Sequence, residues 1–288
     1  MSTASADWEL WSTSAHLVVT KPSALSRAEA IARVVADAIE LACSRFRSDS
    51  ELSRLNRVGE MSVGPELLEL AELAVAARDR TAARFDPTVH DAVAAAGYDR
   101  SFELIDGSAG WTVPARPRCG GRVSVDRAAA RVTLEPGYRL DLGGLAKGWA
   151  ADLVLALLRK AGPALVNAGG DVAVAGRPWP VGVDTPDGTI TLELDRGGLA
   201  TSGCDRRRWR QQGQERHHLI DPATALPAQG DVLTVTVAAP SAAEAEVLAK
   251  TLFLAGSAER ATAEAEALGI PAVLVTRAGA TLLAGGLG

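Results

Sequence analysis

The order of strand-like and helix-like segments is the feature that most limits how this chain can fold. Residues 10–20 and 232–238 have the pattern of strands, and further strand-like runs lie within 164–194 and 272–284. Helical patterns are interspersed among them without regular strand–helix alternation, and hairpin-like pairs recur. This order favours an α+β fold over a doubly wound parallel sheet. We therefore predict mixed or antiparallel sheets flanked by helices.

Capping signals and turn residues predict where helices begin and end. Ser26 with Glu29, and Ser241 with Glu244, have the spacing of a capping box, and Pro65 suits a first helical position. Between residues 101 and 137, glycine, proline and arginine are frequent, so turns and short strands are expected there. The expected helices cover residues 26–42, 65–83, 150–160, 242–255 and 258–268.

Composition argues against several classes of protein. A net charge of −5 argues against nucleic-acid binding, and no apolar stretch is long enough to span a bilayer. Cys43, Cys119 and Cys204 have neither metal-site nor disulfide-framework spacing. No signal peptide is evident, so a cytoplasmic location is expected. Because no linker or repeat stands out, residues 1–288 are expected to form a single domain, with residues 1–9 as a disordered tail.

Residues 140–148 read L-D-L-G-G-L-A-K-G and lie where an apolar strand turns into a helix. Glycines let backbone amides approach a ligand, and a helix N-terminus favours the oxygens of a pyrophosphate. Asp141 would bind a ribose or ring N–H, Lys147 would meet a phosphate, and the Gly144 carbonyl would face a cation such as Mg²⁺. Alternatively, the glycines only turn the chain and Lys147 is solvated.

Three other segments have both an ordinary and a functional interpretation. In residues 46–56, Asn56 either ends a short helix capped by Ser50 or projects its amide into a ligand pocket. Phe85 and Asp86 either form an Asp-Pro-Thr turn or hold a heteroaromatic ring by stacking and hydrogen bonding. Gly169 and Gly170 either form a tight hairpin or allow a close backbone approach to the ligand.

The segment 201–222 carries the strongest candidate for a catalytic base. Ser202 and Gly203 are followed by four arginines between residues 206 and 210, and then by His217 and His218 next to an Asp-Pro turn. A neutral histidine near a reacting hydroxyl is the usual general base. Further on, Glu246 and Lys250 are spaced i, i+4, which is commonly an ordinary pair on a solvated helix face.

In this order, six segments resemble motifs of the ApbE-type FAD:protein FMN transferases. The matches are F-x-x-x-S-E-x-S-x-x-N at 46–56, F-D-P-T-V at 85–89, D-L-G-G-x-A-K-G-x-A-x-D at 141–152, N-x-G-G-D at 167–171, S-G at 202–203 and H-x-I-D-P at 218–222. The resemblance covers nearly the whole chain. It implies an α+β, T-fold-like architecture that binds FAD.

The resemblance also implies a reaction. FAD would be cleaved at its pyrophosphate with the help of Mg²⁺, FMN would pass to a threonine hydroxyl of a target flavoprotein, and AMP would be released. By position, His218 would be the catalytic histidine and Asn56 would influence what is done with bound FAD. The implied ligand contacts are Phe85, Asp86, Asp141, Lys147, Gly169, Gly170 and Ser202 to FAD, and Gly144 to Mg²⁺.

The chain departs from the family pattern at the implied metal site. Where family members usually have D-A-x-x-T on the last long helix, Glu246 and Lys250 stand here. Glutamate still offers oxygen to Mg²⁺, but a lysine ammonium has no lone pair. Our hypothesis is that the ammonium of Lys250 lies where the metal would sit and pairs with Glu246 or a phosphate. Smaller departures are Ala225, often glycine in the family, and Trp11-Ser12-Thr13 in place of M-G-T.

These departures leave two alternatives to the transferase. One is an FAD-binding protein or flavin carrier without transfer activity. The other is an FAD pyrophosphatase that yields FMN and AMP, with water in place of the threonine. The chain itself does not identify the acceptor protein.

Overall fold

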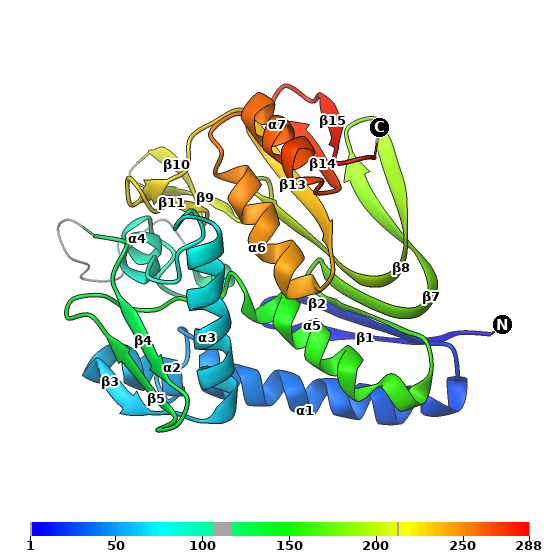
Figure 1. Cartoon of the computed structure of the whole chain (residues 1–288), viewed down its shortest axis with the longest axis horizontal. Helices are drawn as coiled ribbons and strands as arrows, with labels where there is room; N and C mark the ends of the chain where they lie inside the picture. Colours follow the sequence, from blue (N-terminus) through cyan, green and yellow to red (C-terminus); the bar gives the residue numbers. More distant parts are fainter. Residues whose placement is uncertain (1, 106–116, 212, 288) are drawn as a thin grey trace. The chain divides into compact units, whose positions relative to one another are not determined.

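Eight strands form the principal sheet of the computed structural model, in the order β1-β2-β6-β7-β8-β13-β14-β15 (Figure 1). Every neighbouring pair is antiparallel. The strands are β1 (Ala4–Leu10), β2 (Thr13–Val19), β6 (Ala164–Ala168), β7 (Asp171–Thr185), β8 (Gly188–Gly203), β13 (Val232–Ala239), β14 (Ala272–Thr276) and β15 (Thr281–Ala284). The predicted α+β class with antiparallel sheets is confirmed.

The structure describes residues 2–105, 117–211 and 213–287. They divide into two compact units, where a single domain was expected from the sequence. The sheet unit comprises Met1–Asp37, Lys147–Gly203 and Gly230–Gly288. The helical unit comprises Ala38–Ala146 and Cys204–Gln229, so the chain passes between the units more than once.

The N-terminal segment is a strand and not a tail. β1 pairs residue by residue with β2, from Ala4 opposite Val19 to Leu10 opposite Thr13. Trp11 and Ser12 make the connecting turn, both with positive φ (46° and 61°), as a two-residue type I′ hairpin requires. The expectation of disorder over residues 1–9 is therefore wrong for residues 4–9, because these residues supply an edge strand of the sheet.

Helices α5 (Ala146–Leu157), α6 (Ala242–Phe253) and α7 (Ala258–Leu268) belong almost entirely to the sheet unit. Ser241 caps α6 by accepting the Glu244 N–H, as the capping box predicted. Helix α6 packs on β8 and β13. It also approaches α5 so closely that a Cβ on Gly148 would lie 2.6 Å from the Ala242 carbonyl oxygen. Only glycine fits this crossing.

Two helix starts differ from those expected. A short 3₁₀ turn, η1 (Pro22–Ala24), precedes α1 (Leu25–Cys43), so Ser26 lies inside the helix and does not cap it. Helix α5 begins at Ala146, four residues before the expected start. Both helices therefore begin before the first residue predicted from the pattern of apolar residues. Backbone hydrogen bonds in the preceding turns, such as the Leu145 N–H to the Leu142 carbonyl, lead directly into the helix.

The helical unit combines helices with a small sheet and short hairpins. Helices α2 (Glu51–Val58), α3 (Pro65–Arg80) and α4 (His90–Ala95) accompany a three-stranded sheet of β3 (Glu60–Ser62), β5 (Arg131–Leu134) and β4 (Val123–Asp126). The hairpin of β9 (Arg208–Gln211) and β10 (Gln214–His217), and that of β11 (Ile220–Asp221) and β12 (Leu226–Pro227), were not predicted. Among the described residues, no helix combines the length and apolarity needed to cross a membrane.

Candidate functional site

The D-L-G-G segment of the helical unit is a tight turn. One oxygen of Asp141, Oδ1, accepts the Gly143 N–H at 2.9 Å. The N–H groups of Leu145 and Ala146 both donate to the Leu142 carbonyl, which starts the winding that becomes α5. The Asp141 N–H donates to the Pro87 carbonyl at 2.8 Å, so the F-D-P-T-V and D-L-G-G motifs are hydrogen-bonded to each other.

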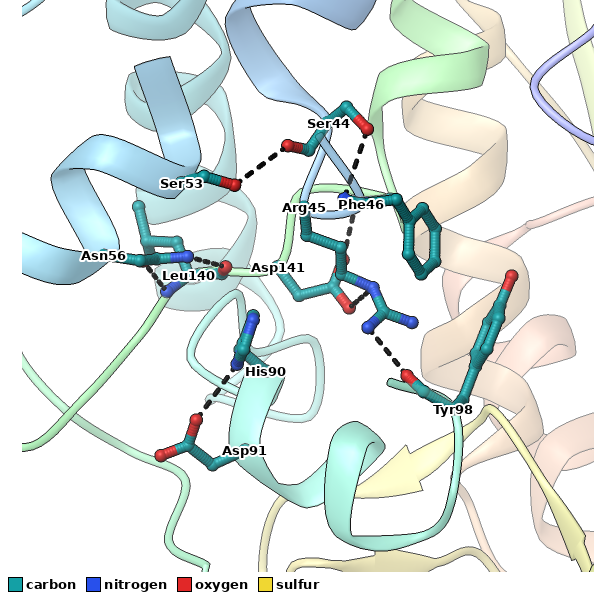
Figure 2. A network of polar contacts seen from close by, with 11 residues as sticks. Ser44, Arg45, Phe46, Ser53, Asn56, His90, Asp91, Tyr98, Leu140 and Asp141 are labelled. Atoms are coloured by element: carbon teal, nitrogen blue, oxygen red, sulfur yellow. Dashed lines mark hydrogen bonds and ion pairs between the residues drawn. The ribbon is translucent and has the colours of Figure 1, made fainter. Parts of the chain in front are cut away.

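Arg45 holds the other oxygen of Asp141, as Figure 2 shows. Its Nε lies 3.0 Å from Asp141 Oδ2, and only 5% of the Arg45 side chain and 10% of the Asp141 side chain are exposed. Arg45 Nη1 also donates to the Tyr98 carbonyl at 2.7 Å. The guanidinium lies 4.1 Å from the ring centre of Phe46 and 4.5 Å from that of Tyr98. Sequence reasoning missed Arg45, although a buried Asp141 requires a partner.

Asn56 also acts on this turn. Its Nδ2 donates to the Leu140 carbonyl at 2.9 Å, and its Oδ1 accepts the Leu140 N–H at 2.7 Å (Figure 2). Helix α2 continues past Asn56 and ends at Gly59 in the left-handed region, so Asn56 does not end the helix. Ser50 caps α2 as expected. The Asn56 amide therefore fixes the backbone next to Asp141.

Asp86 forms the turn that its Asp-Pro-Thr sequence predicted. Its Oδ1 accepts the N–H and the hydroxyl of Thr88, at 2.8 and 2.7 Å. Its Oδ2 accepts the Gly120 N–H at 2.7 Å. Phe85 and Asp86 are both buried. Their contact with a flavin stays a prediction.

A buried ion pair in the same unit was not anticipated. His90 Nδ1 lies 3.0 Å from Asp91 Oδ1, and Arg139 Nε lies 2.6 Å from the same oxygen. Burial by itself raises the pKa of Asp91, but hydrogen bonds from His90 and Arg139 outweigh it and the net pKa is lowered. The sequence signal was available, because Asp91 follows F-D-P-T-V-H directly.

The two adjacent histidines occupy different environments. His217 is buried at the end of β10, with its Nε2 3.0 Å from the Ala228 carbonyl oxygen. His218 is half-buried and lies between β10 and β11. The Asp221 carboxylate accepts the Ala223 N–H and holds the following turn. His218 is thus the more accessible of the pair.

The sheet unit contains a group of four charged side chains, here called the lysine–carboxylate cluster: Lys147, Asp171, Glu246 and Lys250. Lys147 Nζ donates to Asp171 Oδ2 at 2.5 Å and to Glu246 Oε1 at 2.8 Å. Lys250 Nζ donates to the same Glu246 oxygen at 3.1 Å. Glu246 Oε2 accepts the Gly148 N–H at 3.1 Å. The pairing of Lys250 with Glu246 was predicted. The burial of this ion pair was not predicted.

Burial and mutual charge set the protonation of this cluster. Burial and the neighbouring charge of Glu246 raise the pKa of Asp171 to about 6. Burial opposes ionisation of Glu246, but the ammonium groups of Lys147 and Lys250 outweigh it and lower its pKa. For Lys147, burial is likewise outweighed by the two carboxylates, so its pKa rises and it stays charged. The interpretation of Lys147 as a solvated side chain is wrong.

Gly169 and Gly170 link β6 to β7 next to this cluster. Both have positive φ (67° and 100°), as a type I′ hairpin turn requires, so the hairpin interpretation is confirmed. A Cβ on Gly169 would lie 2.6 Å from Thr13 Cγ2 and 3.3 Å from Lys147 Cδ. Ser202 is buried in β8, opposite Val235 of β13.

The residues of the lysine–carboxylate cluster do not fit a divalent cation. Mg²⁺ takes oxygen ligands, but Glu246 Oε1 already accepts two ammonium groups and Oε2 accepts an amide. Two positive charges already balance the two carboxylates. Gly144, the other predicted metal ligand, belongs to the helical unit. Within the part of the chain that the structure describes, no group of three or more His, Cys, Asp or Glu side chains could hold a metal.

Comparison with protein families gives one match that spans the chain. The model of the ApbE family matches residues 11–274. The chain is 29% identical over 268 residues to the FAD:protein FMN transferase of Treponema pallidum, covering 82% of this chain and 73% of that protein. It is 29% identical over 257 residues to the enzyme of the same name from Vibrio cholerae, covering 81% and 75%.

Solved structures share the fold. The ApbE protein of Thermotoga maritima superposes with a TM-score of 0.85 at 28% identity, covering 98% of this chain and 97% of that one. The flavinyl transferase ApbE of Pseudomonas stutzeri, in its apo form, gives a TM-score of 0.84 at 22% identity, covering 98% and 95%. The expected ApbE-like architecture is confirmed.

Proposed function

Because this chain belongs to the ApbE family, we propose that it is an FAD:protein FMN transferase, which moves the FMN part of FAD onto a protein. The match to the family model over residues 11–274 carries this proposal. The six motifs lie inside or next to this range and in the family's order. The two alternatives, a flavin carrier and an FAD pyrophosphatase, are outcomes that the experiment below separates.

The proposed reaction is phosphoryl transfer to a threonine of the target flavoprotein. The threonine oxygen bonds to the phosphorus of the FMN half of FAD, and the bond from this phosphorus to the bridging oxygen breaks. AMP leaves with that oxygen, and the hydroxyl proton passes to a base. Little covalent chemistry falls to the protein, so positioning and charge stabilisation dominate catalysis.

His218 is the proposed base that accepts the threonine proton. Its accessibility, compared with the buried His217, supports this assignment. A neutral imidazole has a pKa close enough to neutrality to take such a proton. His217 instead has its Nε2 next to the Ala228 carbonyl, which suits a structural role.

The other proposed contacts to FAD follow from the family motifs. Lys147 supplies a permanent positive charge for the phosphates. Phe85 and Asp86 are proposed to contact the flavin or adenine ring, and the Asp86 carboxylate is held by the Thr88 N–H. Arg45 forms an ion pair with Asp141, and the Asn56 side chain is hydrogen-bonded to the Leu140 backbone. Asp141 and Asn56 are therefore proposed to position the D-L-G-G backbone. Gly169, Gly170 and Ser202 are proposed to lie near the ligand.

The test combines the purified protein with FAD and a candidate acceptor flavoprotein. We expect flavin fluorescence on the acceptor that survives denaturing electrophoresis, and AMP in amounts equal to the flavin transferred. His218→Ala should lower the rate of transfer by about 10²–10⁴-fold. His16→Ala is the matched control, because His16 lies in β2 and pairs with the exposed Asp7.

Three other outcomes would contradict the proposal. Free FMN with AMP would indicate hydrolysis, and FAD recovered intact with the protein would indicate a carrier. If His218→Ala were as active as His16→Ala, His218 would not be the base that accepts the threonine proton. A cytoplasmic location of the enzyme and its acceptor stays a prediction.

A further inference from the structure

Lysine is rare in this chain, and its distribution is uneven. The sequence contains four lysines and 26 arginines. Lys21 and Lys160 are exposed, whereas Lys147 and Lys250 both donate to one oxygen of Glu246. An ammonium is a compact point charge with three divergent N–H bonds, while a guanidinium is a planar fork. Half of the lysines therefore lie where a compact cation is needed.

The two ammonium groups keep donors that the protein does not use. Lys147 donates to Asp171 and Glu246, which leaves one of its three N–H bonds. Among residues 2–105, 117–211 and 213–287, Lys250 donates to Glu246 only, which leaves two. About a sixth of each side chain is exposed, 16% for Lys147 and 17% for Lys250, so neither lysine is completely shielded from solvent. The carboxylates behind them are almost completely buried.

We infer that Lys147 and Lys250 act together as a resident cation in place of a divalent metal, and that they bind the diphosphate of FAD directly. This inference rests on the proposed function for the identity of the ligand. The remaining N–H bonds suit phosphate oxygens, because a charge-assisted hydrogen bond to phosphate is strong. Glu246 holds both ammonium groups at one point and prevents them from separating.

The arrangement differs from a metal site in one testable respect. A chelator removes a bound metal but leaves a lysine in place. Binding of FAD and transfer of FMN should therefore both proceed in EDTA. Added Mg²⁺ should not displace the lysines, because Glu246 already accepts three hydrogen bonds and the two ammonium groups repel a further cation.

The experiment compares the wild-type chain, Lys250→Thr and the control Lys160→Thr. FAD affinity is measured by quenching of flavin fluorescence in EDTA. We expect Lys250→Thr to bind FAD about tenfold more weakly than wild type, since a hydrogen bond to a charged group is lost. Lys160→Thr should match wild type, because Lys160 is exposed and lies outside the cluster.

Metal uptake is measured separately on the FAD-loaded proteins. Mn²⁺ is titrated and free Mn²⁺ is followed by electron paramagnetic resonance. The wild-type protein should take up none, whereas the double variant Glu246→Asp/Lys250→Thr should bind one ion. Stoichiometric uptake by the wild type would overturn the inference, as would an FAD affinity of Lys250→Thr equal to that of Lys160→Thr.

The wild-type measurements decide the question even if Lys250→Thr does not fold, because metal uptake and EDTA sensitivity need no variant. Failure of the proposed function gives a different result. In that case no acceptor becomes fluorescent, while FAD still binds in EDTA and Lys250→Thr still weakens it. Loss of FAD binding or of FMN transfer by the wild-type protein in EDTA would contradict the inference that the two lysines replace the metal. It would leave the proposed transferase function standing.

Discussion

The two units of this molecule stabilise buried carboxylates in different ways. In the helical unit, the charged partner of Asp141 is Arg45, whose guanidinium lies against two aromatic rings and also donates to the Tyr98 carbonyl. In the sheet unit, Glu246 is shared by Lys147 and Lys250. The arginine is surrounded by protein, whereas both lysines keep unused donors. A buried ion pair can therefore either fix a backbone turn or keep positive charge available to a ligand.

The largest effect is expected at Glu246. Glu246→Gln removes the anion that holds two ammonium groups together, and unpaired buried charge is costly. We expect a loss of about 3–5 kcal/mol in the free energy of unfolding, measured by urea denaturation followed by circular dichroism. Glu29→Gln is the control, because Glu29 pairs with Arg33 on an exposed helix face and should change stability by less than about 1 kcal/mol. A small effect at Glu246 would show that water reaches the cluster.

A smaller effect is expected when Arg45 is changed to lysine. Arg45→Lys keeps the charge next to Asp141, but one ammonium cannot reproduce the contacts with the Phe46 and Tyr98 rings together with the hydrogen bond to the Tyr98 carbonyl. We expect a loss of about 2 kcal/mol in the same assay. Arg33→Lys, at an exposed pair, should be almost neutral. Equal results for the two variants would mean that only charge matters at Asp141.

Asn56→Ala should cost somewhat less. The variant loses both hydrogen bonds to the Leu140 backbone, so the N–H and C=O of Leu140 must bond to water instead. The expected loss is about 1–2 kcal/mol, with faster proteolysis of the D-L-G-G turn detected by mass spectrometry. Asn56→Asp, which keeps the acceptor but not the donor, should fall between Asn56→Ala and wild type. Unchanged cleavage in Asn56→Ala would show that Arg45 alone holds the turn.

The smallest effect is a dependence of stability on pH at Asp171. Its pKa is raised to about 6 by burial and by Glu246, with Lys147 and Lys250 opposing this shift. The folded protein therefore holds a proton that the unfolded chain has released, and the contribution to stability falls as pH rises from about 4 to about 6. Thermal midpoints should show wild type losing stability relative to Asp171→Asn over this range. A constant difference would contradict the raised pKa.

Local patterns predicted local structure well. The Ser241 cap, the Gly169-Gly170 turn and the Asp86 turn all follow from residues a few positions apart. Long-range pairs were not predictable in the same way. Arg45 and Asp141 are 96 positions apart, and the i, i+4 spacing of Glu246 and Lys250 is the same on a solvated face as in a buried cluster. Burial depends on which elements pack together, and periodicity alone does not reveal it.

The scarcity of lysine has a consequence for chemical labelling. An amine-directed acylating reagent requires a deprotonated, reachable nitrogen, and the pKa of Lys147 is raised by its carboxylate partners. In the folded protein, such a reagent should modify the exposed amines at Lys21 and Lys160 and spare Lys147. Fluorophores coupled in this way would report on the surface of the protein and leave the Lys147 ammonium unmodified.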